Sequence, residues 1–530
     1  VVLGSGLIAL VSRTIGDLYF TLHVTPQQLP TSSFVKAAVL GVGATLLASL
    51  PAAREATQAS PQVVLSRSSI ESGLRRLLPR ITIFAVLLTL AGVGFLAVET
   101  TSLVVSYAGL FSVLVGTALF VPLVVVGMMR LLRPILGKLF GTHGRLAAGG
   151  VVAGLSRTAV AVAALTVAVG TAVGVTVMIE SFRGNVEGWL QNTLQADLYV
   201  SAPSLVARRS TNPLPDSFAQ QVIELPAVGA YNSHRHLPLI APEDGTTVNL
   251  NVFDVSDRAH SAYTFRATVD GGAEAAWAAF DSGRDAVFVS EPFAFFQSVG
   301  VGDEVTLPTD RGPRAFEIVG VYVNYASDQG YVGIPRPIFE RYFDDRRIST
   351  LSLYAAAGVS VEELRTAVRD LVPEGATLQL QSNRDLREAS LLVFDRTFAI
   401  TGVLRLLAAL IAFIGVVSAL MALQLERRRE VGMLRAIGFT PAQVAGNTVG
   451  QSALMGLAAG LLSVPVGLTL AWVLIHIINQ RSFGWTLEMA LQPTALLQGI
   501  GLAVGAAVLA ALYPAVVMSR TPAAEALRTD

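Results

Sequence analysis

Six charged side chains gathered in one short stretch are the best candidates for a functional surface in this sequence. The stretch reads ERRREVGMLRAIG and follows residues 404–423, an apolar run with one charge at its edge. Its charged members are Glu426, Arg427, Arg428, Arg429, Glu430 and Arg435. A positive anchor at the inner face of a membrane needs only Arg and Lys, and that reading suits the three consecutive Arg taken alone. The two Glu favour a surface that binds another protein, because such surfaces use both signs to fix register.

The same stretch has the pattern of one short helix followed by a second. An apolar stripe at i, i+3 and i+6 runs between the charges and consists of Val431, Leu434 and Ile437. Gly438 is the expected stop, because Gly adopts the left-handed conformation without a Cβ clash. The residues after it match an N-cap, a first and a third helical position, namely Thr440, Pro441 and Gln443. We therefore predict a rigid charged helix at the membrane surface and a new helix from residue 441.

Catalytic and metal chemistry find little support. The sequence contains no G-x-x-x-x-G-K-[ST] motif, so a phosphate-binding loop would have to come from a partner. It has no Cys, and neither G-x-S-x-G nor H-E-x-x-H occurs. His234 and His236 could touch a metal, but no third ligand lies nearby in the sequence, which favours a polar strand end. We predict no catalytic residue, no metal site, no cofactor in this chain and no nucleic-acid partner.

The composition places most of these residues in a membrane. Of 530 residues, 52% are hydrophobic and 14% charged, with a mean hydropathy of +0.57, whereas soluble domains carry about 25% charged residues. Stretches near the ~20 apolar residues that cross a bilayer predict spans at 34–50, 81–98, 104–129, 158–179, 404–423, 452–478 and 495–517. The apolar residues 1–11 are expected to end a further span, so that the sequence would begin inside the protein.

The loops between these spans predict an orientation. Basic residues gather in the loops at 54–80, 130–157, 427–435 and 520–528. These loops alternate with loops that are poor in Lys and Arg, at 99–103 and 480–494. Cytoplasmic loops are enriched in Lys and Arg, and one orientation satisfies every loop. It places the C-terminus in the cytoplasm and the long polar segment 181–396 outside, in a multi-pass protein of the inner (plasma) membrane.

The polar segment 181–396 has the pattern of a folded α+β domain. Runs of β-branched and aromatic residues predict strands at DLYVSA, TVNLNVFDV, AVFVS, FEIVGVYVNY and TLQLQS, with a helix at SVEELRTAVRDLV. The segment holds 28 of the 38 acidic residues but 18 of the 38 basic ones. The net charge of zero therefore divides into an acidic domain and a basic membrane part. Without disulfides, the domain must be stabilised by its own core.

Two parts of the chain align with each other without a gap. Residues 1–52 superpose on 464–515, and the shared positions include Gly4 with Gly467, Phe20 with Phe483, Pro30 with Pro493 and Pro51 with Pro514. Shared Pro, Gly and Phe carry more weight than shared Leu because they mark turns and helix ends. We predict an internal duplication of a four-span unit, with chance similarity as the alternative. The missing part of the first copy would hold about two and a half spans and a second external domain.

The duplication predicts five regions. The end of the first copy covers 1–66, and a linker with an inserted two-span hairpin covers 67–157. The second copy has its first span at 158–180, the extracytoplasmic domain at 181–396 and a three-span domain at 397–530. The expected fold class is a polytopic α-helical membrane protein with an α+β extracytoplasmic domain, and the intact protein would have ten spans.

Four stretches resemble the FtsX-like (MacB-type) permeases of ABC transporters. ERRREVGMLRAIGFTPAQV is similar to their cytoplasmic signature and LYPAVVMSRTPAAEALR to their C-terminal one. SEPFAFFQSVGVGDEVTLPTDRGPRAFEIVGVY resembles their periplasmic core domain, and VVAGLSRTAVAVAALTVAVG the entry to their first span. The resemblance covers about 145–530. The two prolines of the C-terminal signature are spaced differently in the two copies. Pro514 and Pro522 are 8 residues apart, whereas Pro51 and Pro61 are 10 apart.

The resemblance implies that a separate ATPase does the chemistry. In such permeases a short cytoplasmic helix docks on the ATPase, which binds ATP and Mg, and motion passes through the spans to the external domain. The residues carried over to this coupling role are Glu426, Arg427, Arg428, Arg429, Glu430, Leu434, Arg435 and Gly438. The duplicated form implies two ATPase copies beneath one chain, with membrane lipids and a periplasmic or lipid-linked substrate protein as further partners. The chain itself would not be an enzyme.

Three functions stay open on the sequence alone. The first is an ATP-driven permease that exports or extracts a hydrophobic or lipid-linked substrate. The second is a signalling member of the same family, whose external domain senses a peptide or regulates a cell-wall hydrolase. The third is an ion-coupled transporter, which should place ionisable residues deep in its spans. Lys36, Glu180 and Arg405 all lie close to span ends, so the third function ranks last.

Overall fold

A computed structural model describes residues 68–203, 211–240, 247–395 and 438–520, with scattered positions within 35–50 and 398–433. Its helices are α4 (Ser68–Ala97), α5 (Leu103–Leu139), α6 (Gly141–Ala153), α7 (Leu155–Thr193), α8 (Asp216–Ile223), α9 (Gly272–Asp281), α10 (Glu291–Gln297), α11 (Arg336–Tyr342), α12 (Val361–Asp370), α15 (Pro441–Val473), α16 (Asn479–Phe483) and α17 (Pro493–Arg520). Residues 383–395 are also helical, η1 (Asp257–Ala262) is a 3-10 turn, and η2 (Leu474–Ile478) is a π-helical turn between α15 and α16.

The strands that the structure describes all belong to the domain that is predicted to lie outside the membrane. They are β1 (Leu198–Ser201), β2 (Val228–Ile240), β3 (Thr247–Asp254), β4 (Phe265–Thr268), β5 (Ala286–Ser290), β6 (Glu304–Thr309), β7 (Gly312–Tyr322), β8 (Val332–Pro335), β9 (Thr350–Ala355) and β10 (Gln379–Ser382). They form one mixed sheet in the order β10-β1-β9-β2-β3-β8-β5-β7-β4, with β6 paired to β7. The five predicted strands and the predicted helix at α12 are confirmed, and so is the α+β class.

Five of the described helices are long and apolar enough to cross a membrane. They cover Leu77–Ala97, Leu103–Leu139, Thr158–Thr193, Pro441–Phe483 and Pro493–Val516, and they confirm five of the seven predicted spans. The other two, 34–50 and 404–423, are described only at scattered positions. The first copy of the predicted duplication lies mostly outside the described residues too, so the duplication and the ten-span form stay predictions.

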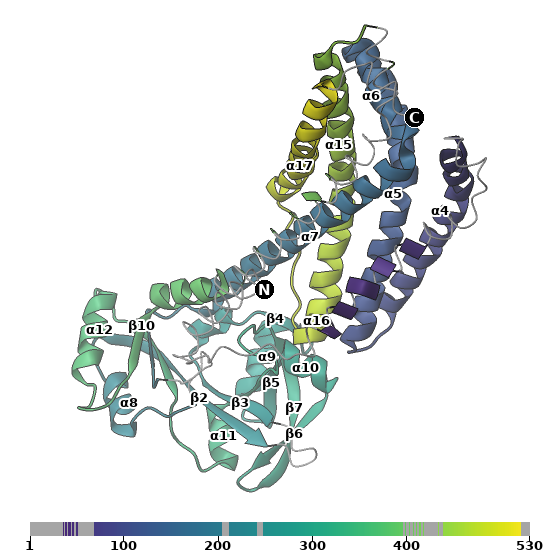
Figure 1. The fold of residues 1–530 in the computed structure, drawn as a ribbon. Coiled ribbons are helices and arrows are strands. Elements are labelled where there is room, and N and C mark those ends of the chain that lie inside the picture. The colour runs from purple at the N-terminus through teal and green to yellow at the C-terminus, as the bar shows by residue number, and fades with distance from the viewer. Residues whose placement is uncertain are drawn as a thin grey trace.

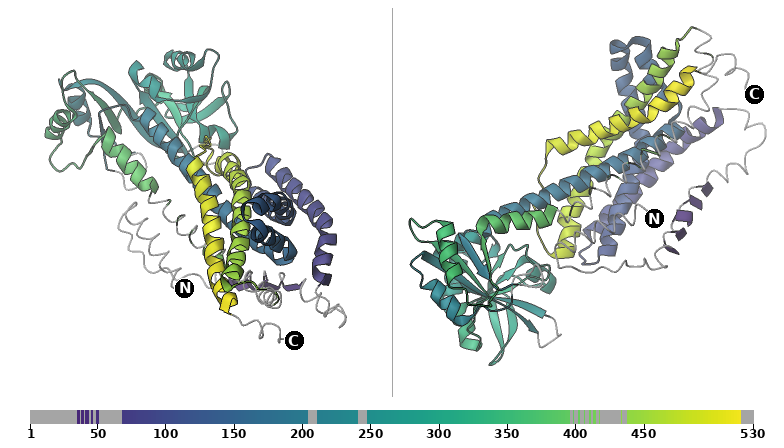
Figure 2. Two further views of the ribbon diagram at one scale, coloured as in Figure 1. Left: turned by 90° about the horizontal axis from the view of Figure 1, so that it is seen from above. Right: turned by 60° about the vertical axis from the view of Figure 1, so that its left-hand side comes forward.

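Small residues let the central membrane helices approach closely. Where α7 crosses α15, a Cβ on Gly174 would lie 2.7 Å from the carbonyl oxygen of Gly467, and one on Gly467 would lie 2.8 Å from that of Gly170. Where α15 crosses α17, a Cβ on Gly456 would lie 2.8 Å from the carbonyl oxygen of Ala503. Helices in lipid associate through such close packing. The three helices therefore form one tightly packed unit, seen side by side in Figures 1 and 2.

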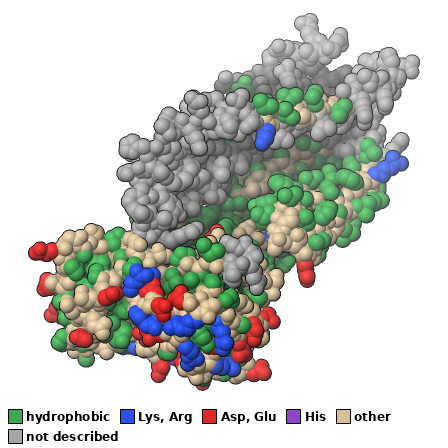
Figure 3. All heavy atoms as spheres, turned by 90° about the horizontal axis from the view of Figure 1, so that it is seen from below, with side chains coloured by type: hydrophobic (Ala, Val, Ile, Leu, Met, Phe, Trp, Pro, Cys, Tyr) green, Lys and Arg blue, Asp and Glu red, His purple; other side chains and the backbone are tan. Residues whose placement is uncertain are grey.

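One helix connects this membrane unit to the domain without a break. α7 has 39 residues, which span about 58 Å at 1.5 Å per residue, well beyond the ~30 Å hydrocarbon core of a bilayer. Figure 1 shows it leaving the other membrane helices and entering the domain. Charged side chains gather on the domain, whereas hydrophobic ones dominate the described surface of the membrane helices (Figure 3).

The domain has two lobes with separate hydrophobic cores. In the first lobe, α8 and α12 pack on β1 and β9 around residues such as Phe218. In the second lobe, β3, β5, β7 and β8 enclose residues such as Phe316. β2 joins the lobes, because it pairs with β9 from Val228 to His234 and with β3 from Ser233 to Ile240. Only two residues of β2 are paired on both sides.

Candidate functional site

The inner end of α15 has the geometry predicted for it. Gly438 has a φ of +105°, the left-handed conformation that Gly adopts most easily. The Thr440 side chain accepts a hydrogen bond from the amide of Gln443 at 3.2 Å, and the Gln443 side chain accepts one from the amide of Thr440 at 2.9 Å. Pro441 is the first residue of α15. The left-handed conformation predicted for Gly438 and the new helix predicted from residue 441 are therefore confirmed, whereas the short helix predicted before Gly438 falls outside the described residues.

The other residues predicted to couple to an ATPase lie outside the described residues. They are Glu426, Arg427, Arg428, Arg429, Glu430, Leu434 and Arg435. Their role stays a prediction from the sequence.

Helix α6 packs beside this restart. His143 on α6 meets Phe439 edge to face, with 5.9 Å between the ring centroids. Gly141 turns the chain between α5 and α6 with a φ of +61°, and Thr158 on α7 donates a hydrogen bond to the carbonyl oxygen of Val151 on α6 at 2.8 Å. Phe439, which follows the predicted docking helix, thus contacts α6. α6 is in turn connected to α5 through Gly141 and hydrogen-bonded to α7 through Thr158.

At the opposite end, the membrane helices meet the domain at a contact that we call the outer joint. It consists of residues 181–189 of α7, the loop 484–490 between α16 and α17, and four domain residues, Arg266, Glu291, Tyr325 and Ser327. The Asn185 side chain donates to the Glu488 carbonyl at 2.8 Å and accepts from the Glu488 amide at 3.1 Å. One helical turn away, Ser181 Oγ accepts from the Ala490 amide at 3.0 Å. The loop is therefore hydrogen-bonded along one face of α7.

The second lobe is bonded to the same loop. Arg266 on β4 donates to the carbonyl oxygen of Thr486 at 3.2 Å and to Glu291 Oε1 at 2.9 Å. The Tyr325 hydroxyl donates to the same Thr486 oxygen at 3.0 Å. Two donors from different strand ends thus converge on one backbone carbonyl of the loop, which fixes its position against the domain.

Glu291 is the buried charge of the outer joint. Its side chain is 6% exposed, whereas that of Arg266 is 36% exposed. Burial raises the pKa of the Glu291 carboxyl, and Arg266 and Thr486 offset only part of this rise. Burial, together with the charge of Glu291, also raises the pKa of Tyr325 to about 12, so this hydroxyl keeps its proton at neutral pH. The carboxylate depends on Arg266 as its compensating charge.

Aromatic rings fill the space between the helices and the domain. The ring of Trp485 lies 4.8 Å from that of Phe483, 5.6 Å from Phe182 and 5.7 Å from Tyr325 between centroids. Its indole Nε1 donates to the Ser327 carbonyl at 3.2 Å. The rings that extend the cluster are Trp189, Phe394 and Phe398. Aromatic side chains are enriched at the membrane–water boundary, and such pairs add about 0.5–1.5 kcal/mol each beyond their burial.

Gly484 brings two backbones into direct contact. Its φ is +70°, and a Cβ on it would lie 2.6 Å from the Cα of Pro292 on α10. The Asn479 side chain donates to the Trp485 carbonyl at 2.9 Å and closes the turn after α16. No side chain separates the loop from α10 here, so the outer joint is stiff at this point.

Arg481 on α16 connects the hairpin of α4 and α5 to the end of the membrane helices that meets the domain. It donates to the carbonyl oxygens of Leu96 at 2.9 Å and Val98 at 2.7 Å, and to Ser106 Oγ at 2.8 Å. A cation suits the free carbonyls at the end of a helix. These bonds place the loops 99–103 and 480–494 on the side of the domain, as the predicted orientation requires.

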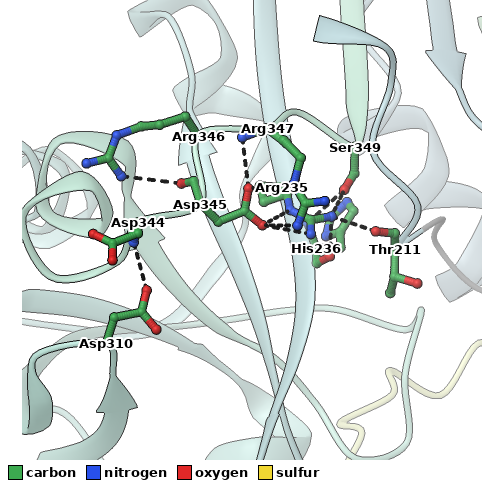
Figure 4. Close-up of polar contacts among 9 residues, drawn as sticks. All are labelled: Thr211, Arg235, His236, Asp310, Asp344, Asp345, Arg346, Arg347 and Ser349. Atoms are coloured by element: carbon green, nitrogen blue, oxygen red, sulfur yellow. Dashed lines mark hydrogen bonds and ion pairs between the residues drawn. The ribbon is translucent and has the colours of Figure 1, made fainter.

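A buried ion pair lies on β2, between the two lobes (Figure 4). Arg235, whose side chain is 7% exposed, donates to Asp345 Oδ2 at 2.9 and 3.0 Å and to Ser349 Oγ at 2.8 Å. The more exposed Arg347 donates to the same carboxylate at 2.9 and 3.0 Å. Burial raises the pKa of the Asp345 carboxyl. The hydrogen bonds from Arg347 and Arg235 outweigh this effect and hold the pKa well below its usual range. The fully bonded pair fits a structural role.

The two histidines of SHRHL lie next to this ion pair. The rings of His234 and His236 stack on β2 with 5.9 Å between centroids. Among the residues that the structure describes, no group of three or more His, Asp and Glu could hold a metal ion.

Sequence reasoning did not single out the outer joint. Ser181, Asn185 and Arg266 bond to loop residues that lie up to about three hundred residues away in the chain, and none of these three belongs to a motif. One signal was available, since Phe483 and Trp485 lie in a short loop between two spans, where interfacial aromatic residues are expected.

Two family descriptions match the parts of the chain that this geometry connects. Residues 158–371 match the MacB-like periplasmic core domain, and residues 402–523 match the FtsX-like permease C-terminal region. In these two parts the chain is similar to an FtsX-like permease and to a MacB-like periplasmic core domain. It is a multi-pass membrane protein whose domain lies outside the cytoplasm.

The chain is also similar along its whole length to a mycobacterial protein. It is 38% identical over 531 residues to an "Uncharacterized ABC transporter permease protein" of Mycobacterium tuberculosis H37Rv. The aligned region covers 100% of this chain and 62% of that protein. The chain therefore spans less than two thirds of the length of this relative.

Two solved structures match part of this chain. The periplasmic region of MacB from Actinobacillus actinomycetemcomitans has 11% identity and a TM-score of 0.28, and the match covers 38% of this chain and 94% of that one. The extracellular domain of the noncanonic ABC-type transporter YknZ from Gram-positive bacteria has 14% identity and a TM-score of 0.25, with 36% and 99% covered.

Proposed function

We propose that this chain is the membrane subunit of an ABC transporter and that a partner ATPase, in two copies beneath one intact chain, binds ATP and Mg. The FtsX-like match over 402–523 supports this, because it includes every residue predicted to couple to the ATPase. In this proposal the segment from Glu426 to Gly438 is the docking surface. The chain supplies no nucleotide chemistry and converts motion of the ATPase into motion of its own domain.

A continuous mechanical path is the observation that carries this proposal. α15 begins directly after the docking segment and leads through η2 and α16 to the loop 484–490, which is bonded to the domain. α7 packs against α15 and enters the domain as one helix. Because both helices are unbroken by loops, a displacement at the inner side reaches the outer joint.

The proposed work is the export or extraction of a hydrophobic or lipid-linked substrate at the outer surface. The aromatic rings of the outer joint support it, because they lie where the helices leave the membrane and an apolar group would meet the domain. A photo-crosslinkable lipid should then label residues within 181–396 during ATP turnover. Labelling confined to the spans would contradict extraction and favour the signalling alternative.

The coupling role is tested by exchanging charges at the docking surface. We expect Glu430→Arg with Arg435→Glu to abolish stimulation of the ATPase in the reconstituted complex, because both signs of the predicted interface are reversed. Membrane insertion should not change. The matched control exchanges Arg384 and Glu388, an ion pair of 2.7 Å on the outer side, as Arg384→Glu with Glu388→Arg. Unchanged stimulation in the first variant, or equal loss in the control, would refute the coupling role.

A further inference from the structure

The end of α5 and the start of α6 present a basic surface that the proposed mechanism does not use. We call it the inner corner and define it by four exposed side chains, Arg130, Arg133, Lys138 and Arg145. The sequence contains no Asp or Glu between residues 101 and 179, so no acid on these helices balances the four charges. The ligand of such a surface should carry negative charge.

The fold brings the four cations together. Three lie in the last turns of α5, and Gly141 turns the chain so that α6 returns along it. A Cβ on Gly137 would lie 2.5 Å from Nε and 2.9 Å from Cγ of Arg145. The stem of Arg145 therefore crosses α5 at Gly137, next to Lys138. Two helices thus build one positively charged surface.

Large apolar side chains are exposed within the same surface. Leu131, Ile135 and Leu139 follow one another at i, i+4 and i+8 and are 69%, 48% and 70% exposed, and Phe140 is 64% exposed. If the surface bound only a soluble acidic partner, this apolar stripe would stay exposed to water. At a membrane boundary the stripe can enter the acyl region, while Arg and Lys extend their charged ends to the headgroups.

The position of the inner corner matches that boundary. α7 leads from α6 to the domain, so the corner lies on the opposite face of the membrane. α5 has 37 residues and a length of about 56 Å, so its last turns extend past the ~30 Å hydrocarbon core. We propose that the inner corner binds the phosphate groups of anionic phospholipids in the inner leaflet. Through His143 and Phe439, a bound lipid would steady the restart of α15 beside the docking segment.

Native mass spectrometry of the bound lipids tests this proposal. The full-length protein is released from nanodiscs of equimolar phosphatidylglycerol and phosphatidylcholine, and the ratio of the two retained lipids is measured. We expect enrichment of phosphatidylglycerol in the wild type. Each basic residue near an anionic surface contributes about fivefold in affinity. Arg130→Gln, Arg133→Gln, Lys138→Gln and Arg145→Gln combined should therefore lower the ratio by at least about fivefold.

Two control variants separate this binding from bulk charge. The charge-keeping set Arg130→Lys, Arg133→Lys, Lys138→Arg and Arg145→Lys should retain the enrichment. The charge-matched set Arg284→Gln, Arg311→Gln, Arg341→Gln and Arg384→Gln, all on exposed domain positions, should retain it too. If the neutralised protein does not fold, the single exposed change Lys138→Gln gives a smaller loss in the same assay.

The outcomes that overturn the proposal are distinct. An unchanged lipid ratio in a folded neutralised variant would exclude an anionic-lipid site. Equal losses in the domain control would assign the enrichment to net charge alone. An unchanged ratio with lost retention of the ATPase partner would make the inner corner a protein-docking surface instead.

Discussion

Replacing Arg266 with Ala should open the outer joint locally while the domain stays folded. Arg266 donates one hydrogen bond to the buried Glu291 carboxylate and one to the Thr486 carbonyl. A hydrogen bond to a charged group contributes about 1.5–3 kcal/mol. Because the Arg266 side chain is 36% exposed, water compensates part of this, and we expect a loss of about 2 kcal/mol. That loss raises the population of the open loop about 30-fold.

Hydrogen exchange of the full-length protein in detergent measures this opening. Amides of residues 484–490 should exchange about 30-fold faster in Arg266→Ala, whereas amides of the first lobe should not change. Arg314→Ala is the matched control, because Arg314 binds Asp285 on the same lobe at 2.6 Å but away from the loop. Unchanged exchange in the loop, or the same increase with Arg314→Ala, would refute the assignment of Arg266 as the bond that holds the joint.

The burial of Glu291 gives this prediction a pH dependence. The folded pKa of Glu291 is raised, so its contribution to stability is fully present below pH 4.5, the ordinary value for Glu, and is lost as pH rises through the folded pKa. Loss of Arg266 should raise that pKa further. Relative to wild type at the same pH, Arg266→Ala should therefore open the joint more at neutral pH than below pH 4.5. Adding Glu291→Gln should reduce the opening at neutral pH.

Two further substitutions, each with a control, test the stability of the domain and the closure of the outer joint. Arg235→Ala should destabilise the domain by about 3–5 kcal/mol in urea unfolding, because it leaves a partly buried carboxylate without its buried partner; Arg347→Ala, at a 51% exposed side chain that binds the same carboxylate, should cost less than about 1 kcal/mol. Gly484→Ala should open the loop 484–490 in hydrogen exchange, because it adds a clash with Pro292 to the strain of a positive φ. Gly312→Ala, with a φ of +97° and open space around it, carries the strain alone and should leave the joint closed.

Features that depend on neighbouring residues were predictable from the sequence. The apolar lengths of the described spans, the left-handed conformation of Gly438 and the Thr440 capping box all follow from a few consecutive residues. The strand at β5 was equally clear, because all five of its residues are apolar or small and buried. In each case the local pattern and the tertiary environment require the same residue types.

The extent of β2 was not predicted: His234 and His236, interpreted as a polar strand end, lie inside this strand, because its environment reverses the usual pattern. Its sequence VGAYNSHRHLPLI has polar residues at positions that the fold buries, including Asn232, Ser233, Arg235 and His236. Hydrogen bonds from other strands and loops make this burial possible, and Asp345 is about 110 residues away. The outer joint was unpredictable for the same reason, since its bonds connect backbone carbonyls of one loop to side chains far apart in the chain.

The domain is attached to the membrane part by links of unequal strength. On one side, α7 continues into the first lobe and is hydrogen-bonded to the loop 484–490, which also holds the second lobe. On the other side, the helix at 383–395 contacts α7 through the ion pair of Arg183 and Asp395, whose side chains are 42% and 53% exposed, and through the ring of Phe394. An exposed ion pair contributes less than about 1 kcal/mol. The domain should therefore follow the packed unit of α7, α15 and α17.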